Sequence, residues 1–68
     1  MRMTKHAIDR IAQRSITKAQ LIQCLTEGKC YENKWDADKW TFVHTGINLY
    51  IVTNKDKNVI ISVFRKER

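Results

Sequence analysis

Proline is absent from this 68-residue chain, glycine occurs only twice, and hydrophobic runs are short. Without proline, low-complexity stretches or a linker, the sequence offers no boundary between domains, and we expect a single domain over residues 1–68. No apolar run reaches the ~18 residues of a membrane-spanning helix, so none is expected. The polar start is unlike a secretory signal, and the cytoplasm is the expected compartment.

Cysteine is also scarce, which limits the metal and redox chemistry that the chain can support. Cys24 and Cys30 are not spaced as a C-x-x-C pair. His6 and His44 would add two further ligands, but the spacing of these four residues matches no zinc pattern. We therefore expect two reduced thiols, no metal and no other cofactor.

Acidic residues are few compared with basic ones. The chain has 13 Lys and Arg against 7 Asp and Glu, which gives a formal net charge of +6. This balance favours an anionic partner: a nucleic acid, an anionic surface or an acidic protein. Basic residues are dense in residues 1–20 and 65–68, and a compact fold can bring both ends to one face. Ordinary solubilising charge is the alternative interpretation.

Two amphipathic helices are expected in the first half of the chain. Thr4 is a suitable N-cap for a helix over residues 5–14, because its hydroxyl can accept a hydrogen bond from an unpaired backbone N–H. The segment Thr17–Gln20 has the pattern of a capping box and begins a second helix over residues 18–27. Gly28 is expected to end that helix in the left-handed conformation.

The second half of the chain has the composition and alternation of strands. Strands are expected over residues 30–35, 39–44, 47–53 and 58–64. Short turns between them predict an antiparallel meander of about three or four strands. The fold class is therefore α+β, with both helices packed on one face of the sheet. The residues expected in its core are Ile8, Ile11, Leu21, Leu25, Leu49, Ile51 and Ile61.

His6, Arg10 and Arg14 form a stripe along the first helix, because successive members are four residues apart. Histidine transfers protons near neutral pH, and the planar guanidinium pairs with two phosphate oxygens. These are residue types that metal-independent RNA cleavage needs. In the structural alternative, the histidine pads the helix start and the arginines are solvated or form ion pairs. Acidic candidates for such pairs are Glu32, Asp36 and Asp38.

The segment His6–Thr17, HAIDRIAQRSIT, resembles the opening of a small bacterial and phage domain family of unknown function, H-A-x-x-R-x-x-x-R-G-I-[ST]. The resemblance extends over residues 6–64 and includes the final strand. That family is similar in architecture to the RelE and BrnT toxins and, more distantly, to the barnase, EndoU and colicin ribonuclease domains. The resemblance implies the fold of a metal-independent ribonuclease.

Three positions depart from the family pattern. Ser15 replaces a glycine, Ser62 replaces a threonine but keeps the hydroxyl, and Phe64 replaces a tyrosine and removes a proton donor. The resemblance implies that the last strand is central and runs under the first helix. Ser62 would then join His6 and Arg10 in one catalytic, phosphate-sized site. The residues expected to bind RNA around it are Arg14, Lys5, Lys18 and Arg65.

Aromatic side chains and the second histidine are further candidates for contacts with RNA. The residues considered for base stacking, against the commoner role in the core, are Tyr31, Trp35, Trp40, Phe42 and Tyr50. His44 is expected to be exposed at a strand end. It becomes a second proton-transfer group only if it faces the same side as His6.

The leading hypothesis from the sequence is a toxin-like, metal-independent endoribonuclease that acts on mRNA or tRNA and is restrained by an acidic antitoxin. One alternative is a non-catalytic basic module that binds nucleic acid or an acidic protein. Another is an accessory protein of a phage or mobile element without enzyme activity. Charge and size fit all three, and the sequence leaves the oligomeric state open.

Overall fold

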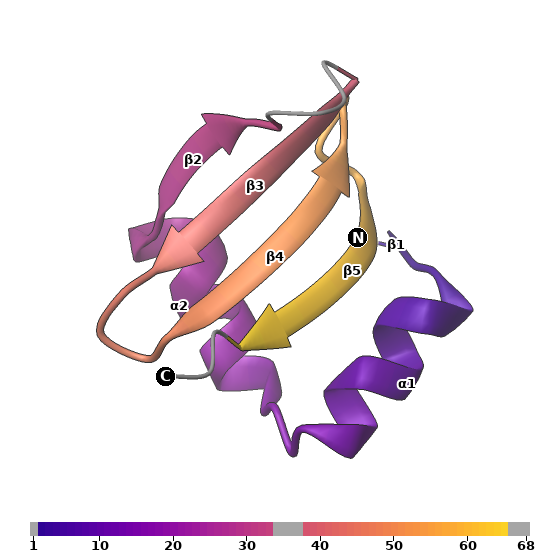
Figure 1. The fold of residues 1–68 in the computed structure, drawn as a ribbon, viewed down its shortest axis with the longest axis vertical. Coiled ribbons are helices and arrows are strands. Elements are labelled where there is room, and N and C mark those ends of the chain that lie inside the picture. The colour runs from indigo at the N-terminus through magenta and orange to yellow at the C-terminus, as the bar shows by residue number, and fades with distance from the viewer. Residues whose placement is uncertain (1, 34–37, 66–68) are drawn as a thin grey trace.

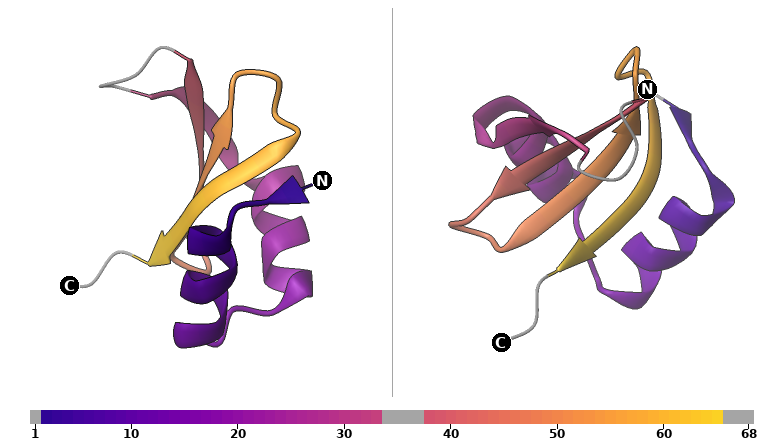
Figure 2. Two further views of the ribbon diagram at one scale, coloured as in Figure 1. Left: turned by 90° about the vertical axis from the view of Figure 1, so that its right-hand side faces the viewer. Right: turned by 45° about the horizontal axis from the view of Figure 1, so that its top comes forward.

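The chain folds into a sheet with two helices, as Figure 1 shows for the computed structural model, which describes residues 2–33 and 38–65. The α+β class is confirmed. Both helices lie on the same side of the sheet (Figure 2). In the described residues, neither helix is long and apolar enough to cross a membrane. The elements are β1 (Arg2–Met3), α1 (Lys5–Gln13), α2 (Lys18–Glu27), β2 (Lys29–Glu32), β3 (Lys39–His44), β4 (Leu49–Asn54) and β5 (Val59–Arg65).

The sheet is mixed, with the strand order β1-β5-β4-β3-β2 in the described residues. Strands β2 to β5 form the expected antiparallel meander. The additional strand β1 pairs in parallel with β5 through Arg2 opposite Val59 and Met3 opposite Ile60. The prediction of a purely antiparallel sheet of three or four strands is therefore wrong. A two-residue strand is too short to show alternation in the sequence.

The helices begin at the expected caps. The Thr4 hydroxyl oxygen accepts a hydrogen bond from the Ala7 N–H at 3.2 Å, and the same hydroxyl donates to the Ile61 carbonyl at 2.7 Å. Thr17 and Gln20 form a capping box with reciprocal hydrogen bonds of 3.0 and 3.1 Å. The contact with Ile61 fixes the start of α1 against β5.

The corner between the helices contains a residue in a strained backbone conformation. The Ser15 N–H donates to the Ala12 carbonyl at 3.4 Å, and the Ile16 N–H donates to the Ile11 carbonyl at 3.0 Å. This is the Schellman pattern, in which glycine is favoured at the position that Ser15 occupies. Ser15 has a φ of 53°. A residue with a Cβ is therefore held in a conformation that steric repulsion disfavours.

Ser15→Gly is expected to raise the free energy of unfolding by about 0.5–1 kcal/mol, because it removes the Cβ from a left-handed residue. The gain is partial, since glycine also increases the entropy of the unfolded chain. Urea unfolding measures the difference. Ser15→Ala is the control, because it keeps the Cβ and removes only the hydroxyl. Equal stabilities of the two variants would contradict this account.

The core lies between the helices and the sheet, and its buried apolar residues in the described chain are Ala7, Ile16, Leu21, Cys24, Phe42, Leu49, Ile51, Ile60 and Val63. Ile11 and Leu25 pack against it while partly exposed. The prediction was wrong for Ile8, which is 53% exposed, and for Ile61. A β-bulge shifts the register between β4 and β5, so that Ile60 takes the inward position. Such a bulge inserts an extra residue and reverses the alternation of faces.

Gly28 ends α2, but not in the left-handed conformation that we expected. Its φ of −71° and ψ of 162° are those of extended backbone. A Cβ at this position would clash with the Cys24 carbonyl oxygen and would lie 2.8 Å from the carbonyl oxygen of Val43. The close approach of two backbone carbonyls, one from the last turn of α2 and one from β3, accounts for glycine here rather than a special φ.

Candidate nucleic-acid interface

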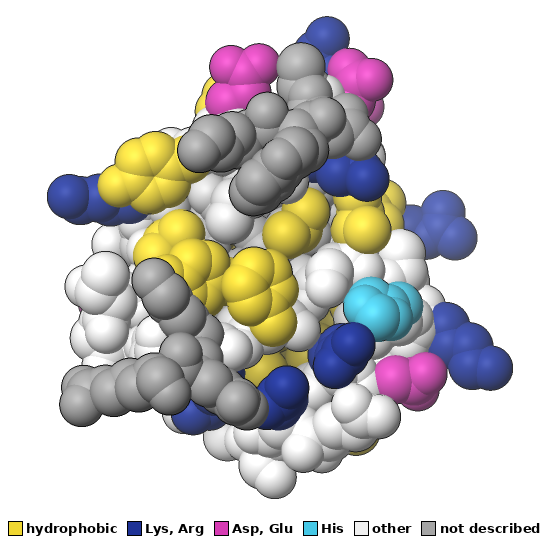
Figure 3. Space-filling view, in the orientation of Figure 1, with side chains coloured by type: hydrophobic (Ala, Val, Ile, Leu, Met, Phe, Trp, Pro, Cys, Tyr) yellow, Lys and Arg dark blue, Asp and Glu magenta, His cyan; other side chains and the backbone are white. Residues whose placement is uncertain are grey.

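The face of the sheet opposite the helices is open. Buried and partly exposed residues alternate along β4, which directs Tyr50 and Val52 away from the helices. In β5, Phe64 lies opposite Tyr50, and Ser62 lies opposite Val52. Hydrophobic side chains gather over the sheet in Figure 3. We call this surface the open face; by strand register its residues include Lys29, Tyr31, Thr41, Val43, Tyr50, Val52, Ser62 and Phe64.

An aromatic pair lies on the open face. The rings of Tyr50 and Phe64 are stacked, with centroids 5.0 Å apart and planes inclined by 10°. Phe64 is 40% exposed, and Tyr31 on β2 is 52% exposed. Partly accessible aromatic rings are side chains on which unpaired nucleobases stack. Large exposed apolar side chains on one face also mark interaction sites more generally.

The other aromatic residues considered for stacking lie elsewhere. Phe42 is buried in the core, and Trp40 packs against the core. The Lys57 ammonium lies over the Trp40 ring at 4.6 Å from its centroid, a cation–π contact at the far end of the sheet. Trp35 and Asp36 lie outside the described residues. Phe64, which sequence reasoning missed, takes the place beside Tyr50.

A basic border runs along the open face where α1 lies beside β5. Helix α1 contacts β5 (Figure 1), and Figure 3 shows a histidine and Lys or Arg side chains over α1, next to the hydrophobic ones over the sheet. His6 and Arg14 are exposed, and Arg10 is half-buried. Lys5 is exposed in the first turn of α1. The stripe predicted from the sequence therefore lies on an accessible helix surface.

No contact within the described residues brings together the expected catalytic residues His6, Arg10 and Ser62. Strand β5 lies under α1 as expected and is an interior strand between β1 and β4, although β4 and not β5 occupies the centre of the sheet. Ser62 points to the open face, because its neighbour Val63 is buried beneath the helices. Within residues 2–33 and 38–65, no hydrogen bond or ion pair joins Ser62 to His6 or Arg10. Ser62 therefore lies on the open face, whereas His6 and Arg10 lie on α1, which packs on the other side of β5.

Arg65 and Lys18, expected to bind RNA, make contacts on the helix side. Arg65 Nη2 donates to Gln20 Oε1 at 3.0 Å, and the same oxygen accepts the Thr17 N–H of the capping box. The Nε of Arg65 is buried without a hydrogen-bond partner in the described chain. Arg65 therefore links the end of β5 to the first turn of α2 through this hydrogen bond. Lys18 lines a groove between the helices.

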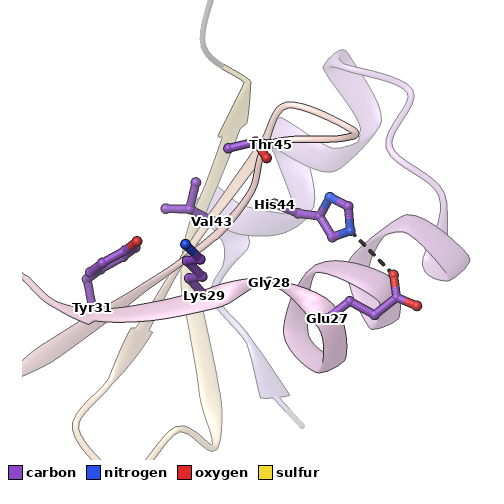
Figure 4. Close-up of a pocket in the computed structure, with 7 residues that line it drawn as sticks. All are labelled: Glu27, Gly28, Lys29, Tyr31, Val43, His44 and Thr45. Carbon is purple, nitrogen blue, oxygen red and sulfur yellow. Dashed lines mark hydrogen bonds and ion pairs between the residues drawn. The ribbon is translucent and has the colours of Figure 1, made fainter.

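A second polar cluster lies where β3 ends (Figure 4). His44 Nε2 lies 3.4 Å from Glu27 Oε2, and His44 Nδ1 accepts the Ile47 N–H at 3.3 Å. Both ring nitrogens thus have partners when the imidazole is neutral. Strands β4 and β5 separate β3 from the edge where α1 lies. The pocket of about 200 Å³ is lined by Glu27, Gly28, Lys29, Tyr31, Val43, His44 and Thr45.

The arrangement places the two histidines in different sites. His44 does not lie beside His6, so the condition for a second proton-transfer histidine at α1 is not met. The pairing of His44 with Glu27 joins the end of a strand to the end of a helix 17 residues away. No local pattern in the sequence signals that contact.

Both cysteines are free. Cys24 is buried, and its Sγ lies 3.5 Å from the Leu49 carbonyl oxygen and 3.7 Å from that of Phe42. Burial raises the pKa of the Cys24 thiol to about 11, although a backbone hydrogen bond with His44 opposes the shift. The thiol is therefore protonated at neutral pH and is a packing group rather than a nucleophile. Cys30 is exposed on β2.

The comparisons with known proteins bear on the family of the chain. A family model described as a domain of unknown function, DUF4258, matches residues 3–65. No match was found among curated proteins or among solved structures. The matched range runs from β1 to the end of β5 and includes the α1 stripe and the open face. The chain therefore belongs to DUF4258, a domain family of unknown function.

Proposed function

We propose that this domain binds single-stranded RNA across its open face and cleaves it without a metal ion, as a toxin-like ribonuclease. The observation that carries the proposal is the stack of the exposed Phe64 on the half-buried Tyr50, with ring centroids 5.0 Å apart, beside the basic border of α1. Stacking on aromatic rings binds bases with little sequence preference, and basic side chains bind the backbone. Duplex RNA would not expose its bases to such a surface.

The order of the elements suggests a path for the strand. Bases would stack on Tyr50 and Phe64, and the chain would leave the sheet across β5 toward α1. There the guanidinium groups of Arg10 and Arg14 would pair with phosphate oxygens. Ser62 lies on the open face with Tyr50 and Phe64 and would donate a hydrogen bond to a phosphate oxygen. The formal net charge of +6 favours the approach of RNA from any direction.

In the cleavage step that we propose, His6 accepts the proton of a ribose 2′-hydroxyl. The 2′ oxygen attacks the adjacent phosphorus, and the bond from phosphorus to the 5′ oxygen breaks. The products are a 2′,3′-cyclic phosphate and a 5′-hydroxyl, whose proton comes from water, and the protonated His6 returns its proton to the hydroxide that remains. Arg10, one turn along the helix from His6, neutralises the charge that develops on the phosphate oxygens.

The His6–Thr17 motif resembles a domain family that is similar in architecture to the RelE and BrnT toxins, and this resemblance supports the same proposal. On this basis the substrate is mRNA or tRNA in the cytoplasm, and an acidic antitoxin restrains the enzyme. The second candidate function is a binding module without catalysis. The distance of β3 from the α1 border favours it, because His44 cannot supply the second proton transfer there.

Phe64→Ala is expected to weaken the binding of a fluorescein-labelled single-stranded RNA about tenfold or more, because one stacking position is lost. Fluorescence anisotropy measures the dissociation constant. Ile22→Ala is the matched control, since Ile22 is 51% exposed but lies on α2. The affinity of the wild-type protein should also fall steeply between low and physiological salt. Equal affinities of the two variants, or an affinity independent of salt, would rule out this RNA surface.

A further inference from the structure

The helix side of the molecule carries a second accessible surface. Helix α1 packs on β5 and α2 packs on β3 and β4, and the helices make little contact with each other. An apolar groove of about 530 Å³ lies between them. Ile8 is 53% exposed and Met3 is 41% exposed. We call this surface the interhelical groove; the residues that line it are Met3, Ile8, Ile11, Lys18 and Leu21.

We propose that the interhelical groove docks an amphipathic helix with acidic flanks, contributed by a partner protein. A groove between two helices accommodates a third helix, whose apolar residues at i, i+3, i+4 and i+7 form one row. Ile8 and Met3 are large apolar side chains already presented to such a row without rearrangement of the core. The proposal does not depend on the RNA-binding function of the open face.

The positive charges around the interhelical groove favour a partner helix with acidic residues. Lys18 lines the groove, and Lys5 lies three residues before Ile8, on the same side of α1. Both lysines are exposed, and Asp9 is the only acidic residue of α1. Glutamate or aspartate beside the apolar row of a partner helix would pair with these lysines. A second copy of this chain would instead oppose lysine to lysine.

The position of the interhelical groove determines whether a partner helix and RNA can bind at the same time. The interhelical groove is on the side of the sheet that carries the helices, whereas Tyr50 and Phe64 lie on the other side. A partner helix in the groove leaves the aromatic pair uncovered. RNA and this partner are therefore expected to bind together, and they compete only for Lys5, which both could contact.

The test selects binders from a display library of helices of about 20 residues, long enough to be helical, with a fixed apolar row and random Glu or Lys elsewhere. The bait is the full chain. The selected pool is expected to be rich in Glu. Ile8→Glu is expected to weaken a selected peptide at least about tenfold in an anisotropy titration, because it places an unpaired charge in the apolar contact.

Two further variants make the test specific. Tyr31→Glu is the matched control, since Tyr31 is 52% exposed but lies on the open face, and it should keep the affinity. Lys18→Glu should weaken the acidic peptide and strengthen a charge-swapped one. Lys18 begins α2, where a carboxylate is favourable to the helix, so this variant is expected to fold. It serves as the test if Ile8→Glu does not fold.

Three results would overturn the proposal. The first is a selected pool rich in Lys or an empty selection. The second is a set of selected peptides that bind the Tyr31→Glu protein more weakly than the wild type but bind the Ile8→Glu and Lys18→Glu proteins as tightly as the wild type. The third is a wild-type protein that sediments as a dimer and becomes a monomer with Ile8→Glu, since a second copy would then be the occupant.

Discussion

Replacing His6 with alanine is expected to lower the rate of RNA cleavage by about 10²–10⁴-fold, the usual effect of removing a proton-transfer group. The fold should survive, because His6 is exposed in the first turn of α1. Its side chain forms no hydrogen bond with the described part of the chain. The cap of α1 is Thr4, which this substitution leaves in place.

A quenched fluorescent RNA measures the cleavage rate, with EDTA present to exclude metal-dependent contaminants. His44→Ala is the control that changes the same residue type at a different site. It removes the contacts with Glu27 and Ile47 at the end of β3 and should leave the rate unchanged. A His6→Ala protein that cleaves at the wild-type rate would refute the assignment. A wild-type protein that binds RNA without cleaving it would decide for the non-catalytic module.

The parts of the fold that follow from local sequence were predictable. The capping box placed α2 at Lys18–Glu27, and alternation placed β3 at Lys39–His44, both as expected. The two-residue strand β1 and the bulge between β4 and β5 were not predictable, because each depends on pairing with a distant segment. The bulge moved Ile60, rather than Ile61, into the core.

Turn chemistry was the weakest part of the sequence interpretation, since the left-handed conformation was expected at Gly28. In the described chain the residues with positive φ are Ser15, Asn48 and Lys57, and neither glycine is among them. Asparagine tolerates the left-handed region, so the hairpin after β3 uses Asn48 instead of Gly46. Serine and lysine have no such preference, and no pattern marks them.

The candidate site also has features that the local sequence predicts and features that depend on packing between distant segments. The stripe of His6, Arg10 and Arg14 is a property of one helix and was visible in the sequence. The stack of Tyr50 on Phe64 requires the register of two strands, and the interhelical groove requires the packing of two helices. The contact of Arg65 with Gln20, which takes Arg65 out of the predicted RNA surface, spans 45 residues. Long-range packing therefore decided which of the basic residues border the open face.

Gly28→Ala is expected to lower the free energy of unfolding by about 2–3 kcal/mol, the upper part of the range for overpacking. The added Cβ would meet the carbonyl oxygens of Cys24 and Val43. Both atoms belong to the backbone, one in α2 and the other in β3, so neither can turn aside as a side chain can. The Cys24 oxygen also accepts the Gly28 N–H at 3.0 Å, which fixes the geometry of the helix end.

Relief of the contact with Val43 requires the end of α2 to move away from β3, and relief of the contact with Cys24 requires the last turn of α2 to open. Either movement would loosen the packing of the buried Cys24 side chain. Urea unfolding with an unchanged m-value measures the loss of stability. Gly46→Ala is the matched control: its Cβ would lie 2.9 Å from Cε1 of His44, a side-chain atom that can shift, and its cost should stay below about 1 kcal/mol. Because neither glycine has a positive φ, backbone strain is the same small term in both variants. Equal losses in the two variants, or a Gly28→Ala protein as stable as the wild type, would show that close approach is not what requires glycine at the end of α2.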